Sequence, residues 1–160
     1  MGKKRKRSRM KLQSSFELLV TLAFGLAILL PLVIIAFIQL AGANANLSSI
    51  ESQQAASKLA SVATLIGSQG PPAKQLVQIQ VPPNVRFIYV GNVNNTVGHE
   101  IIFVITSPSG LSYITSYTPV NVSGSLGGIT STGAYLVNVT ATSSCPSNNQ
   151  EPCVYMTPKV

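Results

Sequence analysis

Residues Leu18 to Ile38 read LLVTLAFGLAILLPLVIIAFI, and none of these 21 residues carries a charge. As a helix that rises about 1.5 Å per residue, the stretch would be roughly 31 Å long, close to the hydrocarbon thickness of a bilayer. The alternative is a buried helix of a soluble protein, but a chain of 160 residues is too small to surround such a helix on every side. Pro31 is compatible with a membrane helix. The stretch therefore predicts a transmembrane helix.

The positive charge of the chain is concentrated before this stretch. Seven of the 11 Lys and Arg residues lie within residues 1–11, and the cations and glutamates after them balance. Because Lys and Arg beside a membrane helix stay on the cytoplasmic side, we expect the N-terminus inside and residues after about 40 outside the cell membrane. A basic tail is not a basic folded face, which argues against a nucleic-acid-binding domain. A cleaved secretory signal, with AGANA at 41–45 as its cleavage site, is a rival interpretation, although its apolar core would be unusually long.

The sequence QSSFE at residues 13–17 joins the basic run to the apolar stretch. A short basic leader, then Gln-x-Ser-x-Glu, then a long apolar run resembles the class III signal peptide of archaeal type IV pilin-like proteins. The resemblance implies that a prepilin peptidase, a membrane-embedded aspartic protease, cuts between Leu12 and Gln13 on the cytoplasmic side. In the family the residue before the cut is commonly small, and here it is Leu12. Gln13, Ser15 and Glu17 would then form the processing site, with Glu17 as the fifth residue of the mature chain and as an assembly residue.

The same resemblance implies a function. The chain would be a structural subunit of an archaeal type IV pilus-like surface filament, a homo-oligomer whose helix is first a membrane anchor and then part of the filament core. Residues 55–84 and 120–126 are also similar to recurring segments of the family. The alternative is a non-polymerising, membrane-anchored envelope protein, such as a minor pilin or an archaellum stator-like accessory subunit, whose exported domain binds a partner.

The exported part begins with a helical pattern and continues with strands. Asn46 or Ser48 is a candidate helix cap, Gly67 and Gly70 mark the helix end, and the helix over 14–66 is either continuous or interrupted near Gly42. One apolar helix face follows a three-and-four spacing: Leu47, Ile50, Leu59, Val62, Ala63 and Ile66. Alternating or β-branched segments predict the strands: from Gln75 to Val81, Arg86–Val90, Glu100–Thr106, Leu111–Val122, Ala134–Ala141 and Cys153–Met156.

These patterns predict an α+β fold in four segments. They are a basic leader (1–12), a transmembrane and assembly helix (13–42), its extracellular continuation (43–69), and a β-domain (70–160) built as a small antiparallel sheet or sandwich.

Two kinds of modification fit an exported domain. Cys145 and Cys153 bound a short segment, for which a local disulfide is favoured over two free thiols or an incomplete metal site. Four Asn-x-Ser/Thr sequons all fall on the predicted outer side. They begin at Asn46, Asn94, Asn121 and Asn138, and Asn138 lies within a predicted strand, so its side chain must face solvent to be modified.

The sequence contains little material for catalysis. There is one histidine, His99, and no aspartate, so a Ser-His-Asp triad is excluded and a multi-ligand metal site lacks ligands. A Ser-His-Glu arrangement would need a glutamate near His99, and Glu100 should point to the opposite face of the same strand. We therefore predict no enzyme activity, no metal and no cofactor, with His99 as an exposed residue of a strand edge. An exported hydrolase is the least favoured interpretation.

Overall fold

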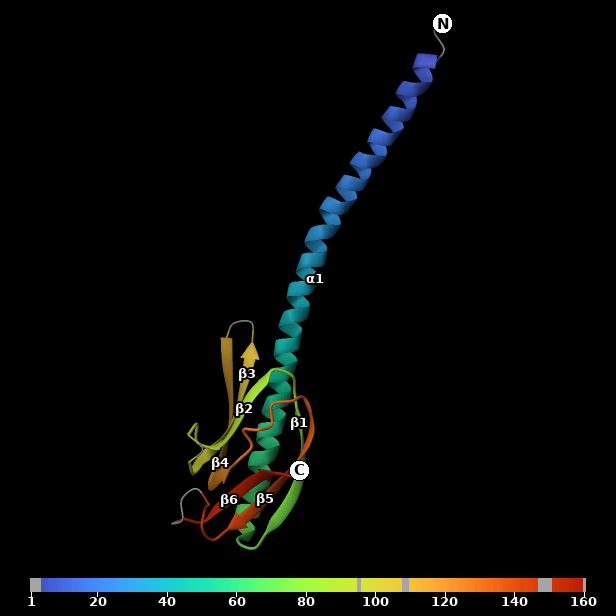
Figure 1. The fold of residues 1–160 in the computed structure, drawn as a ribbon. Coiled ribbons are helices and arrows are strands. Elements are labelled where there is room, and N and C mark those ends of the chain that lie inside the picture. Colours follow the sequence, from blue (N-terminus) through green and yellow to red (C-terminus); the bar gives the residue numbers. More distant parts are fainter. Residues whose placement is uncertain (1–3, 95, 108–109, 147–150, 160) are drawn as a thin grey trace. The chain divides into compact units, whose positions relative to one another are not determined.

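The computed structural model describes the backbone of residues 4–94, 96–107, 110–146 and 151–159, and the side chains in these ranges apart from 4–15, 41 and 45. A helix precedes six strands in these ranges (Figure 1). The elements are α1 (Lys4–Gln69), β1 (Lys74–Val81), β2 (Val85–Gly91), β3 (Gly98–Ser107), β4 (Gly110–Gly124), β5 (Gly133–Thr142) and β6 (Cys153–Pro158). The predicted α+β fold is confirmed, and each predicted strand end lies within two residues of the observed one.

The strands form one six-stranded sheet in the order β1-β5-β6-β4-β3-β2. Neighbouring strands are antiparallel, with one exception: β6 runs parallel to β4 and antiparallel to β5. The prediction of an antiparallel sheet therefore needs a correction at that pair. Because β6 lies between β5 and β4, it joins a β1–β5 ladder to a β2–β3–β4 meander.

Helix α1 passes through Gly42 without interruption, which selects the continuous alternative. The prediction that Asn46 or Ser48 caps a separate helix is therefore wrong. The hydroxyl of Ser48 instead donates to the carbonyl oxygen of Asn44, one turn earlier, at 3.1 Å. By its internal contacts the chain divides into two compact units, Met1–Gly42 and Ala43–Val160.

The second unit is stabilised by a core between α1 and the concave side of the sheet, whose strands curve around this part of the helix (Figure 1). The helix contributes a face of mostly small side chains, including the fully buried Ser52, Ala56, Leu59 and Ala63. Small residues let the helix axis approach the strands closely, and the strands fill the space with Val, Ile and Phe. The core-facing strand residues are Val77, Ile79, Val81, Val85, Ile88, Val90, Ile101, Phe103, Ile105, Ile114, Val122, Val137, Val139, Ala141, Val154 and Met156.

The predicted apolar face of this part of α1 is buried only toward the C-terminal end of the helix, so the prediction is confirmed there and wrong before it. Leu59, Ala63 and Ile66 are buried, whereas Leu47 and Ile50 are 55% and 57% exposed. The helix turns its Ser48 and Ser52 side toward the buried region instead, because those small side chains continue the three-and-four spacing of the Ala-rich face.

The end of α1 is set by a glycine and two prolines. Gly70 has a positive φ of 71°, and its N–H donates to the carbonyl oxygen of Ile66 at 3.2 Å. A left-handed glycine of this kind terminates helices because it has no Cβ to clash. Pro71 and Pro72 follow, joined by a cis peptide bond, and β1 starts at Lys74.

Candidate functional sites

The first candidate site is the apolar surface of α1 in the first compact unit. Every residue from Phe16 to Leu40 is exposed, including Phe24 at 68% and Phe37 at 69%. By length and composition α1 is able to cross a membrane. Exposed apolar area on this scale is unfavourable in water, so the segment requires an apolar environment, either lipid or other protein.

The hydroxyl group within this apolar surface is satisfied locally. The hydroxyl of Thr21 lies 3.0 Å from the carbonyl oxygens of both Glu17 and Leu18, within its own helix. A hydroxyl that bonds back to the preceding turn avoids much of the cost of entering hydrocarbon. Pro31 stands inside the helix without ending it. Both features are tolerated by a helix in an apolar environment.

The predicted processing site is described only in part. The backbone of Leu12, Gln13 and Ser15 is helical, but their side chains lie outside the described residues. Glu17 is exposed at the start of the apolar surface. The described geometry therefore places one ionisable side chain where the apolar surface begins.

The second candidate site is the disulfide. The predicted Cys145–Cys153 bond is confirmed, and the alternatives of free thiols and a metal site are wrong. The bond links the chain after β5 to the first residue of β6. Two hydrogen bonds support the same junction: the N–H of Cys145 donates to the carbonyl of Glu151 at 3.0 Å, and the hydroxyl of Thr142 donates to the carbonyl of Cys153 at 3.0 Å. The arrangement fixes the start of the strand that joins the two parts of the sheet.

The four sequons differ in accessibility. Asn46 and Asn94 are exposed, although the middle residue of the Asn94 sequon lies outside the described residues. Asn121 is half-buried and its amide nitrogen donates to the carboxylate of Glu151 at 3.2 Å. Asn138 is half-buried in β5, and its buried Oδ1 has no hydrogen-bond partner among the described residues. The solvent-facing orientation that modification of Asn138 requires is therefore met only partly.

His99 is exposed as predicted, but its predicted place at a strand edge is wrong because β3 has a neighbour on each side. The pairing of β3 with β4 shifts between Gly98 and Glu100. At this irregularity the ring of His99 lies 5.9 Å from the ring of Tyr117, and its Nδ1 lies 3.2 Å from the carbonyl oxygen of Val120. Within the described part of the chain, no group of three or more His, Cys, Asp or Glu side chains could hold a metal ion.

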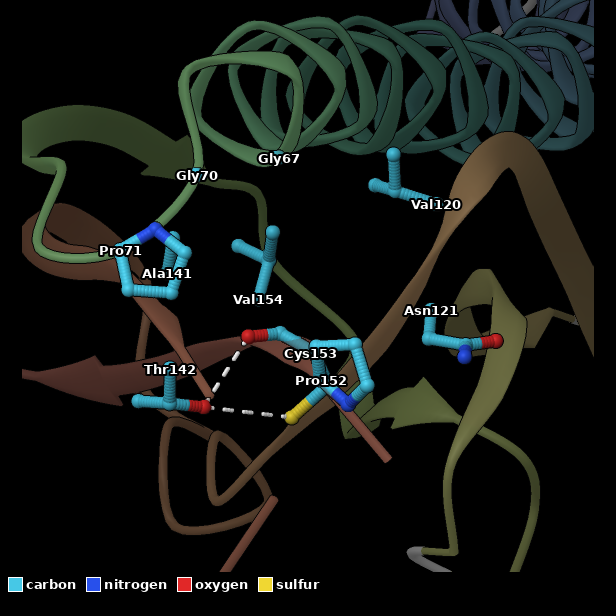
Figure 2. A pocket seen from close by; sticks show the side chains of 10 residues that line it. All are labelled: Gly67, Gly70, Pro71, Val120, Asn121, Ala141, Thr142, Pro152, Cys153 and Val154. Carbon is cyan, nitrogen blue, oxygen red and sulfur yellow. Dashed lines mark hydrogen bonds between the residues drawn. The ribbon is translucent and has the colours of Figure 1, made fainter. Parts of the chain in front are cut away.

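A small cavity lies where the end of α1 meets β4, β5 and β6 (Figure 2). Its volume is about 250 Å³, and the helix end contributes Gly67, Gly70 and Pro71 to its wall. The polar groups beside it are engaged elsewhere, since Thr142 bonds to Cys153 and Asn121 bonds to Glu151. The cavity therefore offers mainly apolar surface and no unengaged nucleophile among those groups.

A further surface was not anticipated from the sequence. We call the sheet side away from α1 the outer face. Aromatic side chains are exposed there, with Phe87 at 41%, Tyr113 at 60% and Tyr117 at 68%. The sequence did contain a signal for it: the run IIFVI at 101–105 is apolar at every position, which is typical of a strand covered on both faces.

Comparison with known proteins finds no matching family model, no similar curated protein and no similar solved structure. The evidence for function therefore comes from residues 13–17, the apolar part of α1 and the β-domain themselves.

Proposed function

We propose that the chain is a structural subunit of an archaeal type IV pilus-like surface filament. A prepilin peptidase removes residues 1–12, the apolar part of α1 anchors the subunit in the cell membrane with its N-terminus in the cytoplasm, and the β-domain lies outside. After leader removal the same helix leaves the lipid and packs in the core of a homo-oligomeric filament.

One observation carries the proposal: an apolar helix segment whose residues are all exposed, Phe16–Leu40, continues into a helix that is the core element of a folded β-domain. Full burial of each large apolar side chain is worth about 1.5–3 kcal/mol. A segment with so many of them is therefore stable only in lipid or against other helices. A helix segment that exchanges lipid for neighbouring helices keeps its apolar surface covered throughout assembly.

Glu17 gives the proposal its specific chemistry. A carboxylate in hydrocarbon costs about 2.5–3.5 kcal/mol by insertion scales, so at the start of the apolar surface it favours a charge partner. Leader removal would create a new amine at Gln13. If that amine belongs to an adjacent subunit, the pair sets the axial register of the filament. If Gln13 cyclises and loses its charge, a hydroxyl such as that of Ser15 of a neighbour is the alternative donor.

The first experiment tests processing. The full chain is expressed with an archaeal prepilin peptidase, and the N-terminus of the mature protein is determined by mass spectrometry. The expected mature chain begins at Gln13, with or without cyclisation, and Leu12→Gly speeds its formation. A chain that begins near Asn46 identifies an ordinary secretory signal and overturns the proposal, as does a chain that keeps its leader.

The second experiment tests assembly. Filaments are sheared from cells that express the wild-type chain, Glu17→Gln or the matched control Glu51→Gln, which removes a carboxylate from the same helix inside the second unit. We expect normal leader removal in all three and a loss of filaments in Glu17→Gln alone. Wild-type filament yield from Glu17→Gln overturns the assembly role of Glu17. Retention of the wild-type chain in membranes, with none in filaments, favours the non-polymerising envelope protein instead.

A further inference from the structure

The outer face of the sheet carries a second, smaller apolar layer over β2, β3 and β4. Ile101 and Phe103 of β3 belong to the core beneath, so the alternating Ile102 and Val104 point to the outer face. These two side chains are nevertheless only 5% and 3% exposed. Side chains of the neighbouring strands must therefore cover them.

The strand register identifies the covering residues. Val104 is paired with Phe87 of β2 on one side and Tyr113 of β4 on the other, and Ile102 is paired with Tyr89 on the β2 side. The rings of Phe87 and Tyr89 stack, with centroids 5.9 Å apart and planes at 25°. The result is a row of aromatic rings that rests on a buried aliphatic base, so the rings are held in place although they face solvent.

A shallow cleft of about 140 Å³ opens between these rings. We call it the aromatic cleft. Residues that line it include Arg86, Phe87, Tyr89, Val104, Leu111 and Tyr113. Arg86 is exposed, and it is the one charged residue of the cleft lining. The cleft thus combines flat apolar ring faces, phenolic hydroxyl groups and a single cation.

We propose that the aromatic cleft binds an acidic polysaccharide, with a sugar ring stacked on Tyr113 or Phe87 and its carboxylate or sulfate bound by Arg86. An aromatic ring face is electron-rich and attracts the slightly positive C–H groups on the flat side of a sugar ring. The guanidinium of Arg86 offers planar, paired donors that match a carboxylate or sulfate group. The phenolic groups of Tyr89 and Tyr113 are able to exchange hydrogen bonds with sugar hydroxyls.

The size and chemistry of the cleft favour this occupant over a protein partner. A cleft of about 140 Å³ is smaller than the roughly 300–1,000 Å³ of sites that enclose a drug-sized ligand, so it suits one ring of a longer chain. A partner helix would require a longer apolar groove that accepts several side chains spaced over successive turns of the helix. The proposal is independent of filament assembly, because the cleft belongs to the β-domain whether the chain polymerises or stays anchored.

The test uses the full-length protein in detergent micelles, titrated calorimetrically with a galacturonic acid hexamer and, separately, with the neutral maltohexaose. We expect the acidic oligomer to bind more tightly than the neutral one. Tyr113→Ala should weaken binding up to about tenfold through the lost ring contact. Arg86→Gln should weaken binding of the acidic oligomer by about fivefold, which is the size expected for an exposed charge pair. The remaining binding should depend less on salt concentration.

Matched controls separate the cleft from the rest of the domain. Leu136→Ala removes an exposed apolar side chain from the outer face of β5, and Lys74→Gln removes an exposed cation from β1. Both should leave binding unchanged. Because Arg86 is exposed, Arg86→Gln should keep the wild-type unfolding temperature, whereas Tyr113→Ala uncovers part of Val104 and should lower that temperature slightly without unfolding the domain. Absence of binding, equal binding of both oligomers, binding that survives both cleft variants, or self-association through the cleft in place of sugar binding overturns the proposal.

Discussion

Gly67 offers a sharp test of the packing between α1 and the sheet. Glycine within a helix normally destabilises it, so a Gly67→Ala substitution would by itself stabilise α1 by about 1 kcal/mol. At this position, however, a Cβ would lie 2.8 Å from Cγ1 of Val120 and 3.1 Å from both its Cβ and Cγ2. The two effects oppose each other, and the structure indicates which is larger.

The clash is difficult to relieve. Val120 is β-branched and stiff about χ1, and the new contact involves its Cβ as well as both methyl groups, so rotation of the side chain does not remove it. Inserting a methyl group into such a contact costs typically about 1–3 kcal/mol. After the gain in helix propensity, we expect Gly67→Ala to lower the free energy of unfolding by about 1 kcal/mol.

The measurement is thermal unfolding of the full chain in detergent, followed by circular dichroism and tyrosine fluorescence. A loss of about 1 kcal/mol should lower the unfolding temperature of the β-domain by roughly 4 °C. Gly42→Ala is the matched control, since nothing lies within 4 Å of a Cβ at that helical position. It should not lower the unfolding temperature.

A double-mutant cycle with Val120→Ala isolates the contact. Val120→Ala alone should destabilise the domain, because Val120 packs partly against the core. In its presence Gly67→Ala should no longer cost stability, which gives a coupling energy of about 1 kcal/mol or more. A stabilising Gly67→Ala, or a coupling energy near zero, would refute the argument that α1 and β4 are in tight contact here.

Three further outcomes follow from the same structure. Reduction of Cys145–Cys153 should lower the free energy of unfolding by about 2–3 kcal/mol in denaturant titrations, whereas a variant with both cysteines replaced by Ala should not respond to reductant. Lys58→Met should lower the free energy of unfolding by about 0.5–1 kcal/mol in the same assay, because the ammonium group of Lys58 donates a hydrogen bond to a β1 carbonyl oxygen at 2.8 Å. Mass spectrometry of the protein from an archaeal host should find higher glycan occupancy at the exposed Asn46 than at the half-buried Asn138; the reverse order would contradict the accessibility argument.

Features that depend on local sequence were predictable. The apolar run 18–38 required a helix in an apolar environment, because its length and lack of charge leave few alternatives. The strands were recognisable from alternation and from β-branched residues, and the helix end from glycine followed by two prolines. The disulfide was predictable because its two cysteines are separated by only 8 positions, so a short loop brings them together.

Features that depend on tertiary packing could not be predicted from the sequence. Leu47 and Ile50 fit the helical spacing of an apolar face, but the choice of buried face is made by the sheet, which accepts the small Ser48 and Ser52 more closely. Alternation of apolar and polar residues likewise predicts a strand but does not predict which strands pair with it. The parallel pairing of β6 with β4 therefore has no signal in the local sequence. The aromatic cleft was missed for the same reason, since Phe87, Val104 and Tyr113 meet only through the strand register.

The position of β6 links the fold to the proposed export of the domain. Among the described strands, β6 is the one that pairs with both the β1–β5 ladder and the β2–β3–β4 meander. The sheet is therefore incomplete until Cys153–Pro158 is available, and the bond that fixes the start of β6 forms in an oxidising compartment. Helix α1, in contrast, can form as soon as it is synthesised, because its hydrogen bonds are local and lipid would satisfy its apolar surface. A chain built in this order would be anchored first and folded second, so that the β-domain acquires its outer face only after it has crossed the membrane.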